Sequence, residues 1–139
     1  MPVSKPTEVV TVFVTRGTDL LVLRRSERVG TYRGHWAGVS GYLERDDPEA
    51  QARTELAEEL GLGDGDVELA AAGAPLTIDD AASGRAWRVH PFRFGLRPGA
   101  SPRLDWEHVE LLWIRPEEMR ALKTVPGLWE AWQNVAGGT

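Results

Sequence analysis

Alternating and β-branched apolar residues predict strands over much of the chain. Runs rich in valine, leucine, phenylalanine and tryptophan, separated by turns that contain glycine, are typical of strands. The predicted strands cover residues 8–15, 20–23, 36–43, 67–71, 85–96 and 109–114. Two segments that contain proline, residues 72–84 and 97–105, are predicted to be loops that cover or flank a site.

A helix is predicted over residues 48–60. Asp47 is a suitable N-cap, Pro48 suits the first helical position, and Glu49 lies near the positive end of the helix dipole. Gly61 is placed to end the helix in a left-handed conformation. Both ends of this helix are therefore defined by local chemistry.

Two shorter helices are predicted near the C-terminus, one opening at Pro116 and one over residues 128–135. Together with the strands they predict an α/β (α+β) fold in which helices pack on a mixed β-sheet. The chain has 139 residues, of which 42% are hydrophobic and 27% charged. This size and composition predict a single globular domain over residues 1–139.

Composition and charge exclude several kinds of protein. The absence of cysteine excludes disulfides, thiolate nucleophiles and cysteine-ligated zinc. A formal net charge of −5 argues against a nucleic-acid polymer as the partner. The sequence has neither an apolar run long enough to span a membrane nor the apolar stretch of a signal peptide, which favours the cytoplasm.

Three glutamates on the predicted helix indicate a cation site. Glu55, Glu58 and Glu59 fall within an arc of about 100°, because a helix turns about 100° per residue. Crowded carboxylates repel one another, and burying them is costly unless a cation neutralises them. Their hard oxygen ligands select Mg²⁺ or Mn²⁺. Taken alone, the same glutamates are also compatible with a solvated helix face.

The segment over residues 40–62 resembles the Nudix box. That pattern is glycine, five residues, glutamate, seven residues, Arg-Glu, an aliphatic residue, any residue, Glu-Glu, any residue, glycine and an aliphatic residue. Its second half matches at Glu55, Leu56, Glu58, Glu59, Gly61 and Leu62. In the first half, Ser40 falls on the glycine position, although Gly41 matches better through a shortened loop. The arginine position holds Thr54, with Arg53 one place away.

The resemblance implies a Nudix-type α/β/α sandwich and Mg²⁺-dependent hydrolysis, with Mn²⁺ as an alternative cofactor. The substrate would be a nucleoside diphosphate derivative or a similar organic diphosphate. Glu55, Glu58 and Glu59 would be catalytic metal ligands, one of them acting as base, and the main-chain carbonyl of Ser40 would add a ligand. Glu107 resembles the acid that many Nudix enzymes supply from outside the box; the alternative is an exposed loop carboxylate.

Substrate contacts are predicted from three other side chains. Arg25 and Arg33 suit phosphate oxygens, because guanidinium groups match them in geometry, although solvated surface arginine is an equal alternative. Trp36 could stack on a base, with packing in the core as the alternative. His108 is predicted to pack or to form hydrogen bonds rather than to react.

Two further functions stay open on the sequence. A Nudix-fold sensor would bind a phosphorylated metabolite without turnover, and Thr54 at the arginine position is the reason to consider it. Isomerisation of an organic diphosphate is disfavoured in its thiol-dependent version by the absence of cysteine. For an enzyme and for a sensor alike, the expected partner is a small phosphorylated metabolite. Many relatives dimerise, so a homodimer is an alternative to a monomer.

Overall fold

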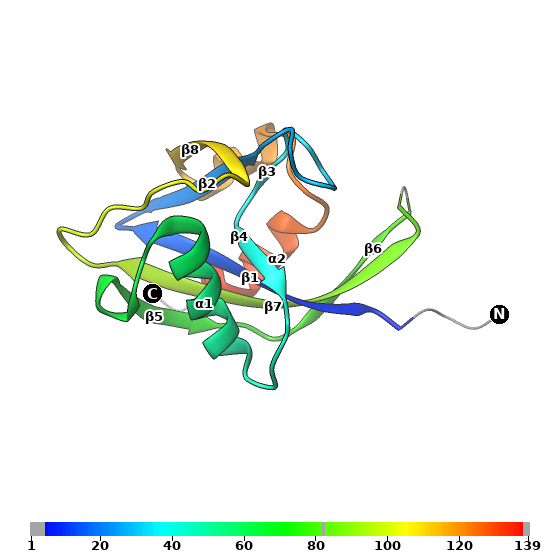
Figure 1. The fold of residues 1–139 in the computed structure, drawn as a ribbon, viewed down its shortest axis with the longest axis horizontal. Helices are drawn as coiled ribbons and strands as arrows, with labels where there is room; N and C mark the ends of the chain where they lie inside the picture. Colours follow the sequence, from blue (N-terminus) through cyan, green and yellow to red (C-terminus); the bar gives the residue numbers. More distant parts are fainter. Residues whose placement is uncertain (1–4, 82, 138–139) are drawn as a thin grey trace.

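A mixed sheet with a helix on each face forms the fold (Figure 1). The computed structural model describes residues 5–81 and 83–137, so the two ends of the domain expected over residues 1–139 lie outside the described part. The strands are β1 (Thr7–Arg16), β2 (Asp19–Arg25), β3 (Trp36–Ala37), β4 (Val39–Tyr42), β5 (Val67–Ala72), β6 (Leu76–Asp80), β7 (Arg85–Leu96) and β8 (His108–Ile114). The helical elements are α1 (Pro48–Leu60), α2 (Leu128–Ala136) and the 3-10 turns η1 (Asp64–Asp66) and η2 (Pro116–Ala121).

Strand β1 organises the sheet because three strands pair with it. It runs parallel to β7 along most of its length and antiparallel to β4 and to the start of β2. Strand β2 continues the sheet through β3 and β8, whereas β7 continues it through β5 and β6. The sheet is therefore mixed, as predicted.

Alternation along the strands divides the core into two layers. Val10, Val12 and Val14 of β1 belong to the cluster that packs against α1. Phe13, between them, belongs to the cluster on the other face with α2. Successive side chains of a strand point to opposite faces, so one apolar strand supplies both layers. The predicted α/β/α sandwich is confirmed.

Helix α1 begins and ends as its sequence predicts. The Asp47 side chain accepts a hydrogen bond from the Ala50 main-chain N–H at 3.1 Å, and Pro48 occupies the first turn. At the other end Gly61 has φ 68°, and the Leu62 N–H donates to the Leu56 carbonyl at 3.2 Å. This Schellman ending satisfies carbonyls that the helix itself leaves unpaired. The box helix is thus fixed at both ends.

Helix α2 closes the opposite face of the sheet. Its Trp132 ring meets Phe13 edge-on, with ring centroids 5.4 Å apart. Gly127 precedes the helix with φ 80°, and a Cβ there would lie 2.5 Å from the Ile78 side chain, so this approach requires glycine. Within the described residues, neither α-helix has the length and apolar character needed to cross a bilayer.

Two predictions of secondary structure need correction. The strand expected over residues 36–43 is two strands, since β3 pairs with β2 and β4 pairs with β1. Gly38 lies between them, where a Cβ would be 3.0 Å from the Val12 carbonyl oxygen, so the chain changes partner at a tight approach. The loop expected over residues 72–84 contains strand β6, which pairs with β7. Its Leu76 and Ile78 alternate with polar residues, but the segment is short and gains its hydrogen bonds from β7.

Candidate active site

A cleft of about 370 Å³ combines glutamates with apolar and aromatic side chains. It lies among β1, β4, α1, the loop after β2 and the hairpin of β6 and β7. The lining residues are Val9, Thr11, Arg25, Thr31, Tyr32, Ala37, Ser40, Gly41, Tyr42, Glu44, Glu55, Glu58, Ile78, Trp87, Val89, Glu107, Val125 and Pro126. Strands distant in sequence and the box helix therefore meet at one concave surface.

Two of the box glutamates, Glu55 and Glu59, form a buried pair, and Glu55 is the one of the two that lines this cleft. Glu55 is 8% exposed and Glu59 is 2% exposed, and their carboxyl groups share a hydrogen bond. Glu58 is exposed and lines the cleft. The helical spacing correctly placed the three side chains near one another, but the sheet buries two of them and leaves the third in solvent.

The surroundings of the carboxyl groups favour a proton or a cation. Burial, the hydrogen bond that Glu59 donates to Glu55, and nearby negative charges raise the pKa of Glu59 to about 10. Burial also raises the pKa of Glu55, and burial together with Asp105 raises the pKa of Glu107 against the opposing effect of Arg25. Desolvation and like charges both disfavour the ionised form unless a cation compensates.

The donor set fits a hard divalent cation, although the side chains do not converge on one point. Among residues 5–81 and 83–137, no three His, Asp or Glu side chains lie close enough together to hold a metal ion. The Oε2 atom of Glu59, however, is buried without a hydrogen-bond partner. A buried acceptor of this kind is costly unless something pairs with it. Glu55, Glu58, Glu107 and Ser40 line the adjacent cleft and supply the oxygen donors that Mg²⁺ and Mn²⁺ prefer.

We expect the metal-free protein to lose stability as pH rises, with Glu59 as a main cause. In the folded chain the pKa of Glu59 is about 10, against an ordinary value of 4.5. The folded chain keeps this proton where the unfolded chain has lost it, so raising the pH lowers the free energy of unfolding, by at most about 1.4 kcal/mol per pH unit. With chelator present, the free energy of unfolding should fall more between about pH 6 and about pH 9 for the wild type than for Glu59→Gln, as measured by thermal unfolding at the two pH values. Equal losses in the two proteins would contradict this assignment.

Gly41 makes room for the Glu55 carboxyl group. A Cβ atom at position 41 would lie 2.3 Å from the Glu55 carboxyl carbon and 2.5 and 2.6 Å from its oxygens. Real Cβ atoms do not approach other atoms so closely, so only glycine lets this carboxyl group lie against β4. The contact supports Gly41, rather than Ser40, as the counterpart of the box glycine.

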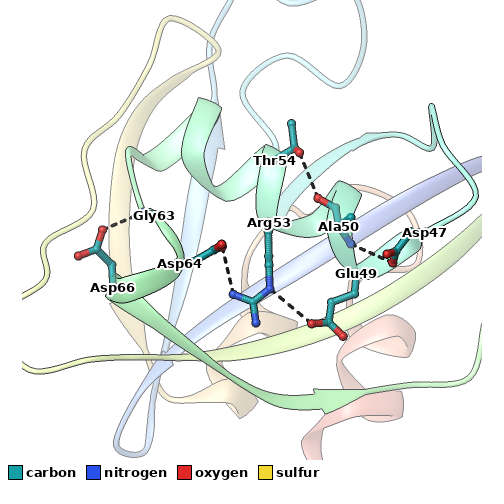
Figure 2. A network of polar contacts seen from close by, with 8 residues as sticks. All are labelled: Asp47, Glu49, Ala50, Arg53, Thr54, Gly63, Asp64 and Asp66. Carbon is teal, nitrogen blue, oxygen red and sulfur yellow. Dashed lines mark hydrogen bonds and ion pairs between the residues drawn. The ribbon is translucent and has the colours of Figure 1, made fainter.

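Figure 2 shows the polar contacts of the two side chains at and beside the arginine position of the box, Thr54 and Arg53. The Thr54 hydroxyl donates to the Ala50 carbonyl oxygen at 3.1 Å. The Arg53 guanidinium contacts Glu49 at 3.4 Å and Asp64 at 3.2 Å. These polar partners lie in α1 and η1, and the Arg53 guanidinium also lies over the Phe94 ring of β7, 5.0 Å from its centroid. None of these contacts involves the carboxyl group of Glu55 or Glu59.

His108 lies directly behind Glu59. It is 4% exposed, and its Nε2 is 4.0 Å from Oε1 of Glu59, while its Nδ1 is 3.6 Å from Oδ1 of Asp105. Burial lowers the pKa of His108, whereas it raises that of Glu59. Both shifts favour the neutral forms of the two groups. The histidine is a buried packing residue, as predicted.

Of the three predicted substrate contacts, the structure brings Arg25 into the cleft and leaves the other two outside its lining. Arg25 Nε donates to the Thr31 carbonyl oxygen at 3.0 Å, which holds the guanidinium at the cleft wall. Arg33 is exposed and donates to the Val29 carbonyl oxygen at 2.9 Å. Trp36 is half-buried and packs against the core layer of α2. The core alternative for Trp36 thus matches its position.

Aromatic residues of the cleft wall were missed by sequence reasoning. Tyr42 is 58% exposed, and its ring centroid lies 6.5 Å from that of Trp87 with a tilt of 39°. Tyr32 donates a hydrogen bond to Asp80 and so joins the loop after β2 to β6. Alternation in β7 already places Trp87 on the same face as Val89, but which face would border the cleft depends on the pairing with β1 and β6.

Solved structures with the same fold include several hydrolases. The C. elegans Ap4A hydrolase binary complex matches with a TM-score of 0.73 and 17% identity, over 94% of this chain and 95% of that chain. The MutT protein from Methanosarcina mazei Go1 matches with a TM-score of 0.69 and 21% identity, over 97% and 96%. The E. coli ORF135 protein matches with a TM-score of 0.68 and 25% identity, over 96% and 92%. These matches show a shared fold.

Sequence comparison extends the match to the family level. No curated protein matches the chain. The model of the NUDIX domain, however, matches residues 5–135, which include α1, its buried carboxyl pair and Gly41. The chain therefore belongs to the Nudix hydrolase family.

Proposed function

We propose that this chain hydrolyses a phosphoanhydride bond in a nucleoside diphosphate derivative or a similar organic diphosphate, with Mg²⁺ as cofactor and Mn²⁺ as an alternative. The observation that carries the proposal is the buried Glu55–Glu59 pair, of which Glu55 lines the cleft and Glu59 has one oxygen left unpartnered. Family membership supports diphosphate hydrolysis in general. The proposed partner is a small phosphorylated metabolite rather than a nucleic-acid polymer.

The carboxylates would have two roles at the reacting phosphate, as metal ligands and as the base. Glu55, Glu58, Glu59 and Glu107 would hold the metal with the main-chain carbonyl of Ser40, and one glutamate would take the proton of the attacking water. When bound, the ion would screen phosphate charge and lower the pKa of a coordinated water. Phosphoryl transfer otherwise needs mainly positioning and charge stabilisation, which a preorganised cleft supplies.

Arg25 is placed to bind a phosphate group beside the carboxylates. Its side chain lines the cleft and is held by Thr31, through Nε to the carbonyl oxygen at 3.0 Å and Nη2 to the hydroxyl at 3.4 Å. Glu107 and Glu59 favour its charged form, although burial lowers the pKa of Arg25. A guanidinium held in this way can contact phosphate oxygens without losing much conformational freedom.

The apolar part of the cleft suits a flat organic group attached to the diphosphate. Trp87 and Tyr42 border the cleft together with Val9, Val89 and Ile78. Aromatic rings bind planar bases by stacking, in addition to the area that they bury. This combination of a carboxylate cluster and an aromatic wall supports a nucleoside derivative as the substrate.

Substituting Trp87 by alanine should raise KM roughly 10-fold with a smaller effect on kcat, because stacking contributes about 1–3 kcal/mol per base. Steady-state kinetics on the best substrate would measure both constants. The matched control is Leu112→Ala, since Leu112 is 38% exposed and outside the cleft lining. An unchanged KM for Trp87→Ala would contradict the proposal that Trp87 stacks on the substrate.

The proposed activity is tested by a substrate panel. The protein is incubated with nucleotides, nucleotide sugars and dinucleotide polyphosphates in the presence of Mg²⁺, and release of phosphate or pyrophosphate is assayed. We expect release from at least one compound, abolished by chelator and restored by added Mg²⁺ or Mn²⁺. Absence of product across the panel, or release that survives chelation, would overturn the proposal.

A sensor that binds without turnover is the second candidate. It is favoured by Thr54, whose hydroxyl donates within α1 and does not reach the glutamate pair. The same panel distinguishes the two functions, because a sensor would be stabilised against thermal unfolding by a ligand that it does not convert. Stabilisation accompanied by product identifies the enzyme.

A further inference from the structure

Gln51 is a buried polar residue beside the carboxyl pair that the mechanism so far leaves without a role. It lies on α1, one turn before Glu55, and is 1% exposed. Its Nε2 donates to Oε2 of Glu55 at 2.8 Å, and its Oε1 accepts from the Glu44 main-chain N–H at 3.1 Å. Both polar atoms of the amide group are therefore satisfied inside the protein.

The second hydrogen bond determines how the amide group is oriented. An amide oxygen can only accept and an amide NH₂ can only donate, and the Glu44 main chain presents an N–H. The oxygen of Gln51 must consequently face Glu44, which turns the NH₂ group toward Glu55. Gln51 is thereby fixed as a donor to Glu55 rather than an acceptor from it.

Two contacts then hold the Glu55 carboxyl group from different sides. Gly41 of β4 lies against it, so close that a Cβ there would be 2.3 Å from the carboxyl carbon. Gln51 binds one of its oxygens from within α1. A carboxylate restrained by a strand and a hydrogen bond is preorganised, and such supporting contacts commonly tune how well a metal ligand binds its ion.

We propose that Gln51 is a positioning residue that holds Glu55 ready for the metal ion, which rests on the function proposed above. The side chains at and beside the box arginine position have other partners, as Figure 2 shows: the Thr54 hydroxyl donates to the Ala50 carbonyl oxygen, and the Arg53 guanidinium donates to Glu49 and Asp64. Gln51 enters the same helix one turn earlier and bonds to Glu55 directly. The restraint on Glu55 thus comes from a different position of the box.

The first test measures Mn²⁺ binding by calorimetry without substrate. Gln51→Met keeps the length of the side chain but removes both hydrogen bonds, and Gln51→Ala provides a second variant should the first fold poorly. We expect the Mn²⁺ dissociation constant to rise about 10- to 100-fold in each. In turnover, kcat should fall by a similar factor while KM changes little. The matched control Gln133→Met, on the exposed side of α2, should bind Mn²⁺ as the wild type does.

A double-mutant cycle separates positioning from a general structural effect. If Gln51 acts through Glu55, adding Gln51→Met to Glu55→Gln should weaken Mn²⁺ binding by less than about two-fold beyond Glu55→Gln alone. Additive effects, or a folded Gln51→Met with the wild-type dissociation constant, would overturn the role of Gln51 while leaving the proposed function intact. A wild-type protein that binds no Mn²⁺ would overturn both.

Discussion

Glu59→Gln is expected to lower turnover by at least about 100-fold while the protein stays folded. Glutamine matches glutamate in size but carries no negative charge, so it would hold a divalent cation poorly. Folding should survive because Glu59 is 2% exposed and its pKa is raised to about 10, which means that the metal-free protein already holds a neutral side chain there. Steady-state kinetics with saturating Mg²⁺ would measure turnover, and circular dichroism would show whether the protein stays folded.

A matched substitution controls for the general effect of removing one negative charge. Glu130→Gln changes an exposed glutamate on α2, on the opposite face of the sheet, and should leave turnover unchanged. If Glu59→Gln retained near wild-type rates in a folded protein, Glu59 would not be part of the catalytic centre. The buried pair would then be a structural feature of the sheet–helix interface.

Gly41→Ala is expected to reduce kcat about 100-fold with little loss of thermal stability, since a misplacement of about 1 Å near the chemistry can cost this much. The added methyl group would lie 2.3 Å from the Glu55 carboxyl carbon, so the carboxyl group must move. Stability should change little because the atoms nearest to the added methyl group belong to the Glu55 side chain and not to the main chain, so the strand itself need not move. Comparing kcat, Mn²⁺ binding and melting temperature would separate these effects.

Gly30→Ala is the control for the glycine substitution. A Cβ at position 30 meets nothing within 4 Å, and its backbone is not in the left-handed region. It should leave both activity and stability near the wild-type values. A fully active Gly41→Ala would show that Glu55 tolerates displacement, and it would weaken the assignment of that residue as a metal ligand.

Local signals were sufficient to predict α1 and the glutamates on it. The cap at Asp47 and the ending at Gly61 depend on contacts between residues close in sequence, and the structure confirms both. Helical spacing likewise placed Glu55, Glu58 and Glu59 together. It could not distinguish the buried pair from the exposed Glu58, because burial depends on where β4 and β8 lie relative to the helix.

Long-range pairing between strands determined the elements that the sequence analysis predicted wrongly. Strand β6 exists because β7 offers it a partner, and the chain divides at Gly38 because β3 and β4 pair with different strands. Pairings of this kind join residues far apart in the chain, and no short window of sequence contains both partners. Alternation in Leu76 and Ile78 was a usable but weak signal.

By itself, the sequence determined a mixed sheet with helices, the capped box helix and the carboxylates that it carries, since these follow from periodicity and contacts within a few residues. The α/β/α sandwich was implied by the resemblance to the Nudix box. Only the tertiary structure decided which carboxylates are buried, and that Gly41 and Gln51 enclose Glu55. It also brought Arg25, Glu107 and Trp87 to one cleft. The physical reason is that desolvation and close approach depend on strands and loops that meet only when the sheet assembles.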